Sequence, residues 1–167
     1  MTEGVVVWVT GPDERIVGGV ARAIVDRLAR RHVTTELLDA RTPGIQALAG
    51  PDMDRRAAFA ASLLVRHGVT VVAAVPSPSR AARAEIRAAL GRMIEVYVPV
   101  GVGRSAYEPP ERAEVQIDFP ESELDAAALR ALRTLEVLGY LRPADDPSYS
   151  EEEERQVIKR LKSFGYI

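Results

Sequence analysis

The sequence alternates short apolar runs with longer segments in which apolar residues recur every three or four positions. The apolar runs lie at 5–9, 36–39, 69–75, 94–100 and 115–119. The segments with helical periodicity lie at 16–31, 52–67, 79–90 and 124–138. Strands that alternate with helices of this length are typical of βαβ units. The pattern therefore predicts an α/β fold, a three-layer sandwich around a mainly parallel sheet of about five strands.

A parallel sheet also indicates where a ligand would bind. Ligands of open α/β sheets lie outside the carboxyl ends of the strands. In this chain the segments to inspect follow Thr10, Asp39, Val75 and Val100.

Composition excludes several classes of function. The formal net charge of −2 gives no reason to expect nucleic acid or an anionic membrane as a partner. No cysteine is present, and no apolar run is long enough to span a bilayer, so we expect a cytoplasmic protein without a metal site. Lysine occurs only at Lys159 and Lys162, which leaves the body of the chain without one.

The last part of the chain differs from the rest. Residues 1–142 form the expected domain, 143–149 a linker marked by prolines and aspartates, and 150–167 a C-terminal amphipathic helix. Ser150 and Glu153 have the spacing of a capping box. The apolar stripe of this helix could pack on its own domain, exchange with a second copy or dock on another enzyme. We favour a homodimer or a partner.

Six short segments occur in an order that resembles the adenylylsulfate kinase (APS kinase) family. They are 7–11 with 20–23, 37–39, 68–74 with 77–83, 95–98, 107–110 and 138–141. The resemblance implies a P-loop NTPase-like fold and a kinase that phosphorylates adenylylsulfate with ATP and magnesium, usually as a dimer.

The phosphate-binding loop of that family is degenerate here. A P-loop needs glycines, a lysine for the phosphate charge and a hydroxyl for magnesium. Counting from Gly11, a glycine position holds Glu14, the lysine position Val17 and the hydroxyl position Gly18. Asp13 and Glu14 would repel a triphosphate, and at a helix N-terminus they serve as internal caps.

Several residues near the expected ligand edge are still of a type that binds anions or nucleotides. They are Asp39, Arg55, Arg56, Ser77, Arg80, Arg83 and Tyr107. Arginines bind phosphate and sulfate bidentately, so these side chains suggest an anion pocket. The alternatives are ordinary ones: solvated or ion-paired arginines, a turn at Asp39, and helix starts at Ser77-Pro78 and at Thr42-Pro43.

These observations favour an adenylylsulfate-kinase-like protein that is catalytically inactive and acts as a regulatory or binding module. A residual site for a sulfonucleotide or sulfate would suit that role, and no cofactor would then be needed. One alternative is an active phosphotransferase with a non-standard site for ATP and magnesium. Another is a structural partner of a sulfur-metabolism enzyme, bound through residues 150–167.

Overall fold

The computed structural model describes residues 3–101, 106–118, 123–144 and 150–167. The elements follow one another in an α/β order, with a short 3₁₀ helix, η1, after the second strand. They are β1 (Val6–Thr10), α1 (Glu14–Arg30), β2 (Thr35–Asp39), η1 (Ile45–Leu48), α2 (Met53–Val65), β3 (Thr70–Ala74), α3 (Arg80–Leu90), β4 (Met93–Tyr97), β5 (Val115–Gln116), α4 (Leu124–Val137) and α5 (Glu151–Ser163).

The strands form one parallel sheet in the order β2-β3-β1-β4-β5, which confirms the predicted fold class. The central strand β1 lies between β3 and β4, with Val7 opposite Val72 on one side and Ile94 on the other. Because the chain crosses over β1 between β3 and β4, the order reverses there, and this reversal is where such sheets bind ligands.

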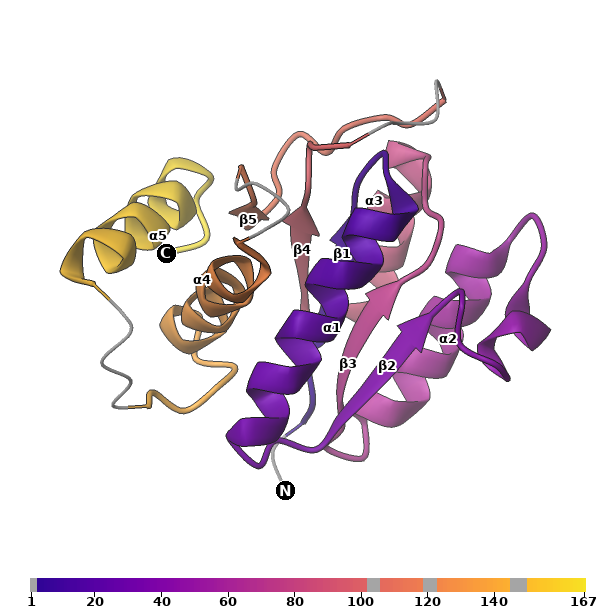
Figure 1. The fold of residues 1–167 in the computed structure, drawn as a ribbon, viewed down its shortest axis with the longest axis horizontal. Coiled ribbons are helices and arrows are strands. Elements are labelled where there is room, and N and C mark those ends of the chain that lie inside the picture. Colours follow the sequence, from indigo (N-terminus) through magenta and orange to yellow (C-terminus); the bar gives the residue numbers. More distant parts are fainter. Residues whose placement is uncertain (1–2, 102–105, 119–122, 145–149) are drawn as a thin grey trace.

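Helices cover both faces of the sheet, and β1 is therefore buried along its whole length (Figure 1). Val5, Val7 and Val9 face a core that they share with α1 and α4. Val6 and Trp8 face the opposite core, with α2 and Ile86 of α3. A strand buried on both faces needs apolar side chains at successive positions, which is why β1 is a continuous apolar run.

The ends of the helices follow local sequence signals in most places. Ser150 and Glu153 form the predicted capping box at the start of α5. Gly139 and Gly165 follow α4 and α5 with φ of 76° and 77°, a left-handed backbone that glycine adopts without strain.

Two predicted helix starts are wrong. α3 begins at Arg80, and Ser79 is its N-cap because the Ser79 side chain accepts the N–H of Ala82. Ser77 instead accepts a hydrogen bond from the indole N–H of Trp8 at 3.0 Å. Thr42-Pro43 starts no helix, since η1 begins only at Ile45, after Gly44.

The C-terminal helix α5 packs on α4 of the same chain, on the side of α4 that faces away from α1 (Figure 1). Val157 and Leu161 are 5% and 0% exposed within the chain itself. Of the three arrangements that the sequence left open, the structure shows packing on its own domain for these two residues, instead of the favoured cover by a second copy or a partner. Glu154 leaves the solvated acidic run to pair with Arg133 of α4.

Within the described ranges, no helix combines the length and the apolar character that crossing a bilayer requires.

Candidate functional site

A pocket opens at the carboxyl ends of β1, β2 and β3, at the predicted ligand edge of the sheet. Its volume is about 40 Å³, room for a few water molecules, since one water needs ~10–15 Å³. Pockets for small molecules usually span ~300–1,000 Å³. Its walls combine prolines and other apolar residues with a few polar groups: Thr10, Gly11, Pro12, Glu14, Val17, Asp39, Ala40, Arg41, Ala74, Val75, Pro76, Ser77, Pro78 and Tyr107.

The loop after β1 is closed by its own side chains. Asp13 is the N-cap of α1, and its carboxylate accepts the N–H groups of Arg15 at 3.0 Å and Ile16 at 3.4 Å. These N–H groups are the kind that a phosphate would otherwise bind at a helix N-terminus. The internal capping expected from the sequence is thus confirmed for Asp13, while Glu14 is the first helical residue and lies in the pocket wall.

The other loop positions pack against protein atoms. A Cβ at Gly11 would overlap the carbonyl of Val98, the residue directly after β4. Val17 is buried in the core under α1, 5% exposed, where a lysine would have to turn outward to meet a phosphate. Protein atoms therefore fill the space around these two positions of the loop.

Gly18 is the most informative position in this loop. A Cβ at Gly18 would overlap the guanidinium of Arg41 and would lie 3.4 Å from the Asp39 carboxylate. The Arg41 guanidinium thus fills the space of a side chain at the position where the family resemblance expects the magnesium hydroxyl. The residues present do not fit a bound magnesium ion at that point, because the positively charged guanidinium of Arg41 lies there.

Asp39 is a buried carboxylate that binds two arginines beside the pocket. It is 2% exposed, and it accepts hydrogen bonds from Arg22 Nη1 at 2.7 Å and from the backbone N–H of Arg41 at 3.0 Å. Burial alone would raise the pKa of Asp39. The hydrogen bonds of Arg41 and the charges of Arg41 and Arg22 outweigh burial and lower that pKa below its ordinary value. Asp39 is therefore an ionised anchor for two guanidinium groups as well as the turn former that the sequence allowed.

Tyr107 closes the pocket from the other side. Its hydroxyl lies 2.8 Å from the hydroxyl of Thr10 at the end of β1. Burial raises the pKa of the Tyr107 phenol, so it remains a neutral hydrogen-bonding group at physiological pH. Ser77 lines the same pocket, with its hydroxyl held by Trp8.

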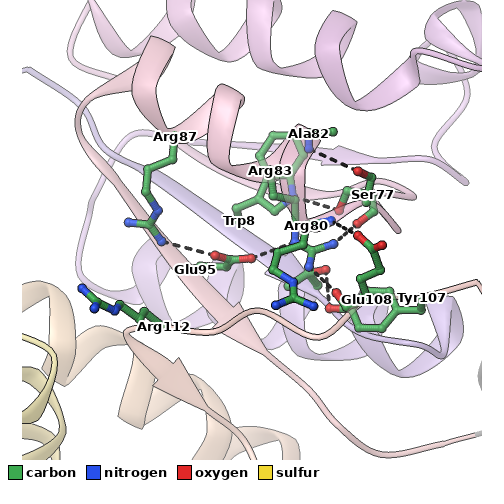
Figure 2. Close-up of polar contacts among 12 residues, drawn as sticks. Trp8, Ser77, Arg80, Ala82, Arg83, Arg87, Glu95, Tyr107, Glu108 and Arg112 are labelled. Carbon is green, nitrogen blue, oxygen red and sulfur yellow. Dashed lines mark hydrogen bonds and ion pairs between the residues drawn. The ribbon is translucent and has the colours of Figure 1, made fainter.

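Arg83 is fully engaged inside the protein (Figure 2). Its side chain is 2% exposed and pairs with Glu95 of β4 at 2.9 Å. It also donates to the backbone carbonyls of Ser77 and Glu108, and its guanidinium lies 5.1 Å from the centre of the Tyr107 ring. Arg83 therefore fixes the wall of the pocket from behind.

The other candidate arginines lie apart from the pocket. Arg55 pairs with Glu85 at 3.0 Å, and Arg80 with Glu111 at 2.6 Å. Arg56 donates to the carbonyls of Leu48 and Ala49. None of these arginines, nor Arg83, lines the pocket, whereas Asp39, Ser77 and Tyr107 do. The structure thus brings together only part of the predicted set.

Sequence reasoning missed Arg41 and Arg22, the cations that occupy the site. The spacing Asp39-x-Arg41 is a signal for a turn in which a carboxylate accepts the N–H two residues on. Arg22 lies one helical turn beyond Gly18, so both face the same side of α1. Only the packing of α1 against the end of β2 brings these groups together.

Comparison with known proteins agrees with the geometry. The family model described as adenylylsulphate kinase matches residues 3–104. The adenylyl-sulfate kinase of Gloeothece citriformis is 30% identical over 83% of this chain and 98% of that protein. A probable adenylyl-sulfate kinase of Pyrococcus abyssi is 28% identical over 83% of this chain and 99% of its own length.

Solved structures give the same result. A hexameric APS kinase from Thiobacillus denitrificans superposes with a TM-score of 0.73 and 28% identity over 86% of this chain, which spans 31% of that protein. An APS kinase of Mycobacterium tuberculosis, solved with AMPPNP and APS, shares the fold with a TM-score of 0.66 and 22% identity, over 81% of this chain and 99% of that one. The five-stranded parallel sheet, the order of its elements and these matches together show that the chain belongs to the adenylylsulfate kinase family.

Proposed function

We propose that this protein is a non-catalytic binding or regulatory module of its family, without phosphate transfer from ATP. The observation that carries the proposal is the Arg41 guanidinium, which lies on Asp39 in the space above Gly18. Phosphoryl transfer depends on positioning and on cations that neutralise the developing charge. In this site a protein cation is fixed to a protein carboxylate, and no lysine stands in the loop.

The loop geometry supports the same conclusion. The Asp13 carboxylate accepts the N–H groups at the start of α1, so the backbone donors that a phosphate would bind there are already taken. The loop thus favours a stable closed state over phosphate binding.

A residual ligand would meet a different set of groups. Arg41 and Arg22 are each about half exposed beside the buried Asp39, with side-chain exposures of 46% and 49%. Each guanidinium has five donors in a fork that matches a sulfate or phosphate group. We therefore expect an anionic ligand, such as the sulfonucleotide of the family, to contact Arg41 beside Ser77 and Tyr107 and to need no magnesium.

The test combines binding with turnover. Purified protein is titrated with adenylylsulfate, its 3′-phosphorylated product, ADP and ATP. Each titration is done once with magnesium and once with a chelator, and the melting temperature and the heat of binding are measured. Adenylylsulfate is then incubated with ATP and magnesium, with the Gloeothece citriformis enzyme as the positive control. We expect no phosphorylated product and binding that does not depend on magnesium.

The matched variants are Arg41→Ala, in the pocket, and Arg55→Ala, an arginine that pairs with Glu85 on the surface. Anion binding should weaken only in Arg41→Ala. Turnover near ~1 s⁻¹, at the low end for kinases, that Asp39→Asn abolishes would overturn the proposal in favour of an active phosphotransferase with a non-standard site.

A further inference from the structure

We infer that the C-terminal helix α5 positions the pocket wall at Tyr107 through a stiff connecting segment, and that Tyr166 and Arg160 are the positioning residues. The segment, called the strap below, consists of residues 106–114. The contacts between the strap and the C-terminal residues involve no ligand. Only the consequence for ligand binding rests on the proposed function.

One end of the strap is attached to α5. The hydroxyl of Tyr166 donates to the carbonyl of Arg112 at 2.9 Å, and Nε of Arg160 donates to the carbonyl of Ala113 at 2.9 Å. Gly165, with φ of 77°, reverses the chain after α5, and the N–H of Tyr166 then bonds to the carbonyl of Leu161. This reversal holds the Tyr166 ring against the strap.

The same end of the strap is also held by a buried charged residue, Glu114. Glu114 is 2% exposed and accepts hydrogen bonds from Arg87 Nη2 and from the backbone N–H of Glu95, both at 2.8 Å. Burial, and then the charge of Glu114, raise the pKa of Tyr166 to about 12. Tyr166 is therefore a neutral donor at any physiological pH, and this contact does not switch with pH.

The other end of the strap forms the pocket wall. Tyr107 meets Thr10, and the N–H of Glu108 donates to the carbonyl of Pro78 at 2.9 Å. The carboxylate of Glu108 accepts the N–H of Arg80 at the start of α3 at 2.8 Å (Figure 2). The position of the strap thus sets the position of Tyr107 relative to the end of β1.

The middle of the strap contains Pro109 and Pro110, which stiffen the connection between its α5 end and its Tyr107 end. A proline ring fixes φ near −65°, and consecutive prolines form a semi-rigid extended chain. A shift of the carbonyls at Arg112 and Ala113 should therefore reach Glu108 and Tyr107, because fewer backbone torsions between them are free to rotate.

A purely structural role for α5 would not need these contacts. Its apolar residues Val157 and Leu161 are buried, and Glu154 pairs with Arg133 of α4. The hydrogen bonds of Arg160 and Tyr166 end on the strap instead of on α4. Arg160 of α5, and Tyr166 just after it, are thus the residues that connect this helix to the strap.

The experiment compares two single-hydroxyl variants at the C-terminal end of the chain by hydrogen–deuterium exchange. Tyr166→Phe keeps the ring and removes the bond to Arg112. Ser163→Ala removes a bond of similar kind, from the Ser163 hydroxyl to the carbonyl of Arg160 within α5. Losing one net hydrogen bond should speed exchange about fivefold, and we expect this at strap amides, Glu108 included, only in Tyr166→Phe.

Amides of β1 and α1 serve as the internal reference and should be unchanged in both variants. Equal exchange of the strap in the two variants, or faster exchange throughout Tyr166→Phe, would overturn the inference. A second arm measures adenylylsulfate affinity, which should fall about two- to fivefold in Tyr166→Phe alone. If the unmodified protein binds no adenylylsulfate, the proposed ligand is wrong, while the exchange comparison still decides the coupling.

Discussion

Replacing Arg83 with methionine removes the charge from the most buried ion pair that the structure describes while keeping most of the aliphatic stem. Arg83 is 2% exposed, and its partner Glu95 is 8% exposed. After the change, the nearer carboxylate oxygen of Glu95 has no guanidinium, and Arg87 remains at 3.3 Å from the other. The carbonyls of Ser77 and Glu108 lose a donor as well.

Breaking a buried pair by removing one partner costs about 3–5 kcal/mol, because the remaining charge stays desolvated. In a domain of this size each kcal/mol lowers the melting temperature by about 2–4 °C. For a loss of about 4 kcal/mol, Arg83→Met should therefore melt about 8–16 °C lower than the unmodified protein. Differential scanning calorimetry measures both the midpoint and the enthalpy.

Arg55→Met is the matched control, because Arg55 pairs with Glu85 on the surface at exposures of 58% and 66%. An exposed pair contributes ~0.2–1 kcal/mol, so this variant should shift by no more than about 4 °C. Similar melting temperatures for the two variants would refute the assignment of Arg83 as the buried support of the pocket wall. Adding Glu95→Gln to Arg83→Met should recover part of the loss, since the unpaired charge disappears.

Three further changes test other parts of the structure. Gly18→Ala should displace the half-exposed guanidinium of Arg41 from Asp39 and change the unfolding free energy in denaturant melts by no more than about 1 kcal/mol, because the end of a flexible side chain can move away. Because the pKa of Asp39 is lowered in the folded state, its stabilisation is complete above about pH 4 and is lost as pH falls through the folded value. Asp39→Asn should flatten that acid limb of a melting-temperature series, and an unchanged limb would contradict the role of Asp39. Leu161→Ala should cost about 2–5 kcal/mol of unfolding free energy if α5 packs on its own domain in solution, and almost nothing if it does not.

Local signals in the sequence determined the elements of this fold. The run Val5 to Val9 favours a strand covered on both faces, because all of its side chains are apolar and four of the five are β-branched valines. Ser150 and Glu153 define the start of α5, and Gly139 ends α4, because caps satisfy backbone groups within a few residues. The prediction of a lost phosphate loop also rests on local sequence, because Val17 and Gly18 carry neither the amine nor the hydroxyl that such a loop uses.

Sequence signals placed Asp39 and Ser77 at the ligand edge because the carboxyl ends of parallel strands meet at one edge of the sheet, whereas Tyr107 was named through the family resemblance. Nothing in the sequence indicated that Arg83 is buried, because its neighbours in the chain resemble those of an exposed arginine. Its burial depends on Glu95, which lies on another strand, and a charge is buried only where such a partner exists.

Long-range packing determined the remaining side-chain contacts, because a side chain can bond only to partners that the fold brings within reach. Ser77 has the sequence of a helix cap, yet the indole of Trp8, 69 residues away, takes its hydroxyl. Arg41 lies over Gly18 only because the end of β2 meets the first turns of α1. Tyr166 finds the carbonyl of Arg112 only after α5 has folded back on α4. No periodicity or motif encodes such contacts, since they join segments that are distant in the chain and adjacent only in the folded protein.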